Sequence, residues 1–119
     1  MRILITGGAG YIGSHVVASA RKAGFSVVVI DDLSTGFADR IPADVPFINA
    51  DIADRDAVAA AIKQHAITGV VHLAAKKQVG ESVEQPFLYW DWNINKMITF
   101  LEVLSANGVT QFVYSSSAA

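Results

Sequence analysis

A glycine-rich turn near the start of the chain constrains its fold more than any other feature. An apolar run at residues 3–5 leads into the turn, residues 6–14 read TGGAGYIGS, and an amphipathic segment follows. This order predicts a strand, a tight turn and a helix. The first turn of a helix offers unpaired N–H groups and the positive end of the macrodipole, and glycine lets backbone approach a phosphate closely. The turn is therefore typical of a site that binds the diphosphate of a dinucleotide.

A carboxylate stands at the distance along the chain that such a site requires. The glycines fit GxGxxG counted from Gly8, or GxxGxxG counted from Gly7. The β-branched run of residues 26–30 ends at Asp31, about 20 residues after Gly10, the interval at which an acid meets the adenosine ribose. Asp31 can accept hydrogen bonds from both ribose hydroxyls, and its charge repels a 2′-phosphate, so NAD is favoured over NADP. The alternative is an aspartate in a surface turn.

Strand-like and helix-like segments alternate along the whole chain. Strands are predicted at residues 3–5, 26–30, 45–49, 70–73 and 111–114, and helices at 12–23, 55–65 and 86–106. Alternation of this kind predicts an α/β fold with right-handed crossovers and a Rossmann-type doubly wound parallel sheet in the order 3-2-1-4-5. Ligands in such sheets bind beyond the carboxyl ends of the strands, here between the first and fourth strands.

Single residues mark the ends and faces of these elements. Pro46 indicates that the third strand lies near a sheet edge, and Asp54 is a good N-cap for the second helix. The first helix is predicted to bury one apolar face, formed by Ile12, Val16, Val17 and Ala20. The long helix, which ends at Asn107-Gly108, is predicted to present a row of large apolar residues: Phe87, Trp90, Ile94, Ile98, Leu101 and Leu104.

Composition excludes several classes of function. With 119 residues and a net charge of −2, the chain has one modest core and no basic surface for nucleic acid or anionic membranes. It lacks an apolar run of membrane-spanning length. The absence of cysteine excludes disulfides and thiolate ligands and fits a cytoplasmic protein. His15, His65 and His72 are too scattered to form a metal site, and His72 is expected in the interior.

Further polar residues are predicted at the carboxyl ends of the strands. Asp51 can accept a hydrogen bond from the adenine amino group, with Ile52 packed on the ring, or it can be an ordinary turn carboxylate. Asp32 fits a solvated neighbour of Asp31. The pair Lys76-Lys77 can meet ribose or diphosphate oxygens, or can be simply solvated. A hydroxyl from residues 115–117 can reach a substrate oxygen beside the nicotinamide, or can be only a polar strand end.

With these residues in place, the chain resembles the N-terminal part of the UDP-glucose 4-epimerases, a family of extended short-chain dehydrogenases/reductases. The matching stretches are ITGGAGYIGSH at residues 5–15, DDLSTG at 31–36, DI at 51–52, HLAAKKQVGESV at 72–83, QP at 85–86 and YSSSA at 114–118. The resemblance covers the whole chain. The glycine turn is shared by many nucleotide-sugar enzymes, whereas residues 79–82, VGES, are more particular to the epimerases.

The resemblance implies an activity and a set of contacts. In this family tightly held NAD takes a hydride from C4 of the hexose, and the 4-keto sugar turns and receives it on the other face. The cofactor contacts implied are Gly7, Gly10, Tyr11, Ile12, Gly13, Asp31, Asp32, Leu33, Ser34, Thr35, Gly36, Asp51, Ile52, Leu73, Ala74, Ala75 and Lys77. Ser117 matches the serine that hydrogen-bonds the reacting sugar oxygen, and Ala118 lies beside it at the UDP-sugar. A homodimer through helix 86–106 is also implied.

Three departures from the family pattern qualify these expectations. Trp92 stands at a usual asparagine that contacts the cofactor, and Lys96 and Met97 replace a common Gly-Thr pair. The Tyr-x-x-x-Lys base and the nucleotide-sugar domain are expected beyond Ala119. Residues 1–119 are therefore expected to form an incomplete NAD-binding domain that is inactive alone. The alternatives are another NAD-dependent nucleotide-sugar epimerase, a dehydratase, and a non-catalytic module that senses NAD.

Overall fold

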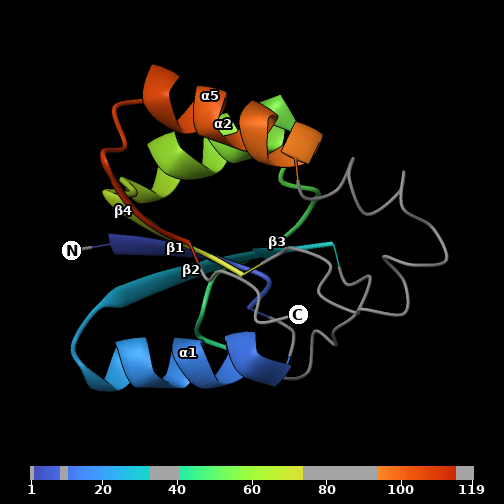
Figure 1. The fold of residues 1–119 in the computed structure, drawn as a ribbon. Helices are drawn as coiled ribbons and strands as arrows, with labels where there is room; N and C mark the ends of the chain where they lie inside the picture. Colours follow the sequence, from blue (N-terminus) through green and yellow to red (C-terminus); the bar gives the residue numbers. More distant parts are fainter. Residues whose placement is uncertain (1, 9–10, 33–40, 74–93, 115–119) are drawn as a thin grey trace, which may run out of the picture.

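Three layers make up the molecule, with a parallel sheet between helices (Figure 1). The computed structural model describes residues 2–8, 11–32, 41–73 and 94–114. Helix α1 covers one face of the sheet, and α2 and α5 cover the other. The elements are β1 (Arg2–Thr6), α1 (Tyr11–Lys22), β2 (Ser26–Asp31), β3 (Phe47–Asn49), α2 (Arg55–His65), β4 (Gly69–His72), α5 (Lys96–Ala106) and β5 (Gln111–Tyr114).

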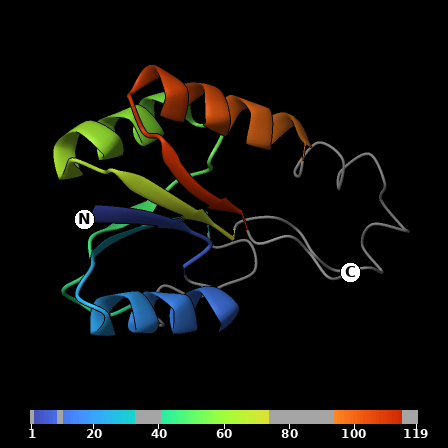
Figure 2. The same ribbon diagram turned by 60° about the vertical axis from the view of Figure 1, so that its left-hand side comes forward.

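The five strands are all parallel, in the order β3-β2-β1-β4-β5. This confirms the predicted order and the α/β fold class. In the register of the sheet, Thr6 at the end of β1 pairs with Ile30 of β2 on one side and His72 of β4 on the other. Figure 2 shows β4 and β5 running side by side in the direction of β1. The carboxyl ends of the strands therefore lie along a single edge.

The central strands are buried on both faces, as their continuous apolar sequences predict. Alternate residues such as Leu4 and Val28 pack with α2 and α5, where Val58 and Phe100 are fully buried. The intervening residues, Ile3, Ile5, Val27 and Val29, pack on the other face with Val17 of α1. The sheet thus separates two apolar clusters, one beneath each helix layer.

The third strand is an edge strand, as Pro46 suggests, but it is shorter than the predicted segment 45–49. The Pro46 carbonyl already accepts a hydrogen bond from Val29 N at 2.9 Å. Val45 N instead donates to Pro42 O at 3.0 Å, within a turn. Because that turn uses the Val45 amide and proline has no N–H, regular pairing begins only at Phe47.

Helix α2 has the predicted bounds and the predicted cap. The Asp54 carboxylate accepts a hydrogen bond from Ala57 N at 3.1 Å, which satisfies one of the unpaired donors of the first turn. At the other end Ala66 adopts the left-handed conformation, with φ of 51°, and its N–H bonds to Ile62 O. The short-range signals in this part of the sequence were sufficient to place the helix.

One predicted helix face, that of α1, is wrong in part, and in α5 the structure shows which apolar residues face the core. In α1, Ile12 is 64% exposed, and Gly13 and Val17 face the sheet instead. In α5 the buried residues are Phe100, Val103 and Leu104, whereas the predicted row at Ile94, Ile98 and Leu101 is exposed, by 39%, 53% and 41%. Of the four members of that row that the structure describes, Leu104 alone is buried. Helix α5 ends at Asn107, as predicted, and Gly108 follows with φ of 76°. Residues 86–93 of the predicted long helix, with Phe87 and Trp90, lie outside the described residues.

Close contact between the start of α1 and the end of β1 depends on glycine. A Cβ at Gly13 would lie 1.9 Å from the Gly7 carbonyl oxygen, and one at Gly8 would lie 2.6 Å from Val29 Cγ1. Gly7 itself has φ of 72°, in the region that other residues rarely adopt. These contacts explain why Ile12 is exposed, since the residue that faces the strand in this turn must have no side chain.

Replacing Gly13 with alanine is expected to lower the free energy of unfolding by about 3 kcal/mol, because the new methyl group meets backbone that cannot rotate away. Gly69→Ala is the matched control. Its Cβ would lie 3.6 Å from Gln111 Cβ, an ordinary contact, so the expected change is under about 1 kcal/mol. Urea unfolding of both variants measures the difference. Equal effects would show that the contact with Gly7 is not the constraint.

Candidate functional site

The carboxyl edge of the sheet brings together residues that are far apart in the sequence. Gly7 follows β1, Asp31 ends β2, Asp51 follows β3 by two residues, and Leu73 follows β4. The pairing of Thr6 with both Ile30 and His72 aligns these ends. The predicted convergence on one edge is therefore confirmed for Gly7, Asp31 and Asp51, whereas Ala74 and Ala75, the residues predicted for the end of the fourth strand, lie outside the described residues. Residues 115–117, the fifth contribution, lie outside the described residues.

The turn and helix beside this edge fit an anion. No acidic residue lies in the first turn of α1, so none of the residues of that turn neutralises the positive end of the dipole. The Gly7 N–H is already bonded to Ile30 O at 3.0 Å, which ties the turn to β2. At position 13 only glycine fits, because the Cβ of any other residue would meet the Gly7 carbonyl oxygen. The residues present thus fit a diphosphate held against helical N–H groups.

Asp31 lies where a ribose contact requires it. It is the last residue of β2, pairs in register with Asn49 of β3, and is only 9% exposed. Asp32, the next residue, is half-buried. The low exposure of Asp31 argues against an ordinary surface-turn aspartate, because charged side chains are rarely buried unless they are paired. A carboxylate at this strand end, beside the turn after β1, can accept hydrogen bonds from a sugar.

Asp51 is held by two contacts, one on each oxygen. Its Oδ1 accepts a hydrogen bond from Ala53 N at 2.8 Å, and its Oδ2 accepts one from Lys96 Nζ at 2.6 Å. Ile52 is 4% exposed and belongs to the core beneath α2 and α5. The Ile52 side chain therefore packs in the core, and its contact with an adenine ring stays a prediction. The sequence marked Lys96 only as a departure from the family pattern, so its contact with Asp51 was missed.

A second feature missed from the sequence joins β1 to β4 at the switch point. Thr6 Oγ1 lies 2.8 Å from His72 Nδ1 and also accepts the Leu73 N–H at 2.8 Å. Thr6 is fully buried and His72 is 3% exposed, with the rings of Phe100 and Phe112 at 5.4 and 6.0 Å. His72 is therefore an interior histidine, as expected. The hydroxyl and ring together fix the main chain where the two strands meet the crevice.

Several predicted contacts cannot be placed. Those outside the described residues are Gly10, Leu33, Ser34, Thr35, Gly36, Ala74, Ala75, Lys76, Lys77, Trp92, Ser117 and Ala118. Within the described ranges, no group of three or more histidine, aspartate or glutamate side chains could hold a metal ion. None of the helices in those ranges is long and apolar enough to cross a membrane.

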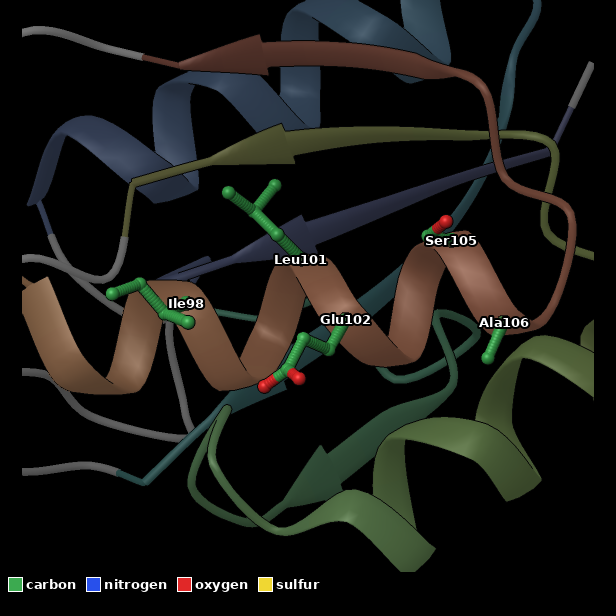
Figure 3. A pocket seen from close by; sticks show the side chains of 5 residues that line it. All are labelled: Ile98, Leu101, Glu102, Ser105 and Ala106. Carbon is green, nitrogen blue, oxygen red and sulfur yellow. The ribbon is translucent and has the colours of Figure 1, made fainter.

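An open hollow lies away from the strand ends, on the surface of α5. Figure 3 shows the side chains that line it, and all come from this one helix: Ile98, Leu101, Glu102, Ser105 and Ala106. A hollow lined by a single helix does not enclose a small molecule in the way that a ligand pocket does. It is a helix face, and the candidate ligand site remains the carboxyl edge of the sheet.

Curated relatives with this sequence pattern share one activity in their names. The chain is 43% identical over 119 residues to the UDP-glucose 4-epimerase of Corynebacterium glutamicum, and 44% identical over 119 residues to that of Streptomyces lividans. The alignments cover 100% and 99% of this chain and 36% of each relative. The chain therefore spans about a third of the length of the relatives that it matches.

Solved structures agree with the fold and with the family. A crystal structure of the Thermus thermophilus UDP-glucose 4-epimerase in complex with NAD has a TM-score of 0.93 at 40% identity, over 98% of this chain and 37% of that one. The Stenotrophomonas maltophila enzyme, with bound NAD and formylated UDP-arabinopyranose, has a TM-score of 0.95 at 42% identity, over 99% and 37%. Residues 3–119 also match the family described as NAD dependent epimerase/dehydratase. The chain belongs to the NAD dependent epimerase/dehydratase family.

Proposed function

We propose that this chain supplies the NAD-binding part of a UDP-glucose 4-epimerase, which interconverts UDP-glucose and UDP-galactose. The observation that carries the proposal is the alignment of Gly7, Asp31 and Asp51 on one sheet edge beside the start of α1. That arrangement offers separate places for a diphosphate, a ribose and an adenine. The two relatives and the two solved structures named above, which match nearly the whole chain, are UDP-glucose 4-epimerases, and this supports that activity over others in the family.

The residues of the chain act by binding and orienting. The N–H groups at the start of α1 face the diphosphate, Asp31 accepts from the ribose hydroxyls, and Asp51 accepts from the adenine amino group. NAD, when bound, supplies the hydride acceptor and donor for C4 of the sugar. Ser117 is proposed to hydrogen-bond the reacting sugar oxygen. The proton at that oxygen needs a general base, which we propose lies in a Tyr-x-x-x-Lys motif beyond Ala119.

The full-length gene product is expected to convert UDP-galactose into UDP-glucose with NAD present and no net consumption of the cofactor. Nuclear magnetic resonance of the sugar anomeric signals measures both epimers. Ser117→Ala is expected to lower kcat by about 10²-fold, since a positioned hydroxyl in proton transfer contributes on that order. Loss of water from the sugar instead of epimerisation would identify a dehydratase, and NAD binding without turnover would identify a sensing module.

Asp31 is expected to set the preference for NAD over NADP. Asp31→Asn removes the charge while keeping the size, so NAD should bind about tenfold more weakly, and the preference over NADP should fall by at least as much. Calorimetric titration of both dinucleotides measures these changes. Asp44→Asn is the matched control, because Asp44 is 71% exposed and pairs with Arg21 near the other end of α1. Tighter binding of NADP than of NAD by the unsubstituted protein would exclude the assignment of Asp31.

We also propose that a second copy of the chain covers the exposed apolar face of α5. Ile94, Ile98 and Leu101 are spaced by four and three residues, so they share one face of the helix. Figure 3 shows Ile98 and Leu101 along the same hollow. A contiguous apolar face of this kind is typical of a surface that binds another protein. The same resemblance that predicts the activity predicts a homodimer at this helix.

Ile98→Glu is expected to raise the dimer dissociation constant by more than about tenfold, because it places a charge where the second copy would bury an apolar side chain. Sedimentation velocity over a concentration series measures this. Gln64→Glu, which adds the same charge at an exposed position of α2, is the control and should leave the dimer unchanged. A monomeric unsubstituted protein, or equal effects of the two changes, would exclude this interface.

A further inference from the structure

The ion pair between Lys96 and Asp51 stands apart from the others that the structure describes. Of the three pairs between described residues, Arg55–Glu102 has both side chains 57% exposed, and Arg21–Asp44 has side chains 37% and 71% exposed. Lys96 and Asp51 are only 23% and 31% exposed, at 2.6 Å. Solvent screens this pair less, so its geometry is held more firmly than that of a surface pair.

Lys96 reaches Asp51 from a different part of the chain. It lies in the first turn of α5, whereas Asp51 lies in the loop after β3, 45 residues earlier in the sequence. The residue before it, Asn95, already has helical φ and ψ, and its side chain makes no capping hydrogen bond. The ion pair therefore joins α5 to the loop that carries Asp51.

The two contacts of Asp51 determine how its carboxylate is turned. Ala53 N binds Oδ1 and Lys96 Nζ binds Oδ2, so the carboxylate cannot rotate without breaking one of them. Each carboxylate oxygen can accept about two hydrogen bonds, so both contacts leave room for another donor. A donor that approaches from the carboxyl edge therefore meets an acceptor of fixed orientation.

We propose that Lys96 is a positioning residue for adenine recognition, which holds Asp51 in the orientation that accepts the 6-amino group of the cofactor. The inference rests on the proposed function, because it requires NAD at this edge. Lys96 acts through Asp51 and does not itself contact the base. Without the lysine the carboxylate keeps only the Ala53 contact, so it can turn away. Discrimination between an amino group and an oxygen at position 6 of the purine then falls.

The test compares NAD with nicotinamide hypoxanthine dinucleotide, in which the 6-amino group is replaced by a carbonyl oxygen. Calorimetry is used to measure the dissociation constants of both for the full-length protein and for Lys96→Met and Lys96→Arg. The unsubstituted protein should prefer NAD by about tenfold or more, the effect of one hydrogen bond to a charged acceptor. Lys96→Met should reduce this preference to about threefold or less. Lys96→Arg, which keeps the cation, should retain most of it.

Two controls separate positioning from a general structural role. Arg55→Met breaks the ion pair that joins α2 to α5, with Glu102 at 3.0 Å, and should leave the preference unchanged. In an Asp51→Ala background, where the acceptor is gone, Lys96→Met should have no further effect on the preference. A further loss in that background would mean that the lysine does not act through Asp51.

The other possible results each contradict the inference, and they can be told apart from one another. If Lys96→Met weakens both dinucleotides equally, or changes neither, the lysine does not position the adenine contact and the inference is wrong, although the proposed function stands. If the unsubstituted protein binds both dinucleotides equally well, Asp51 does not recognise the 6-amino group, and the inference is wrong. Failure of the unsubstituted protein to bind either dinucleotide would overturn the proposed function and this inference together.

Discussion

The near-contact of Gly13 with the carbonyl of Gly7 is the constraint on which the rest of the structure depends. It brings the first turn of α1 against the end of β1, where a Cβ would lie 1.9 Å from an oxygen. The amide donors of the helix thereby reach the edge where the parallel strands end. The same contact decides which residues of α1 are buried, so it exposes Ile12 and directs Val17 into the core. Both the packing of α1 against the sheet and the position of its N–H groups at the ligand edge therefore depend on glycine at position 13.

Parallel pairing then distributes the polar groups along that edge. Because the register aligns Thr6 with Ile30 and His72, the residues that follow these three, Gly7, Asp31 and Leu73, reach the same level. The buried hydroxyl of Thr6 reinforces this alignment, since it lies 2.8 Å from His72 Nδ1 and accepts the Leu73 N–H. A buried polar group is stable only when it is paired, and here the pairing joins β1 to β4. These contacts thus hold the carboxyl ends of β1 and β4 together.

Sequence reasoning succeeded where the signals are local and failed where the contacts are distant. The cap at Asp54, the buried runs of β1 and β2 and the strand order follow from short patterns. The exposed face of α5 could not be found in this way, because the spacing of Ile94, Ile98 and Leu101 fits a buried face equally well. Only the packing of Phe100 and neighbouring residues against the sheet decides which face is inside. The Lys96–Asp51 contact spans 45 residues and has no local signal.

Helix α5 contributes to three parts of the molecule: the core, the ligand edge and the outer surface. Its inner face, with Phe100, Val103 and Leu104, completes the core above the sheet. Its first residue, Lys96, binds Asp51 at the ligand edge, and its outer face leaves Ile98 and Leu101 exposed. Since a helix moves largely as a rigid body, displacement of the outer face by a partner would also move Lys96 relative to Asp51. The burial of Phe100 opposes such movement, because shifting the helix would open a cavity in the core. The core contact therefore isolates the ligand edge from events on the outer surface.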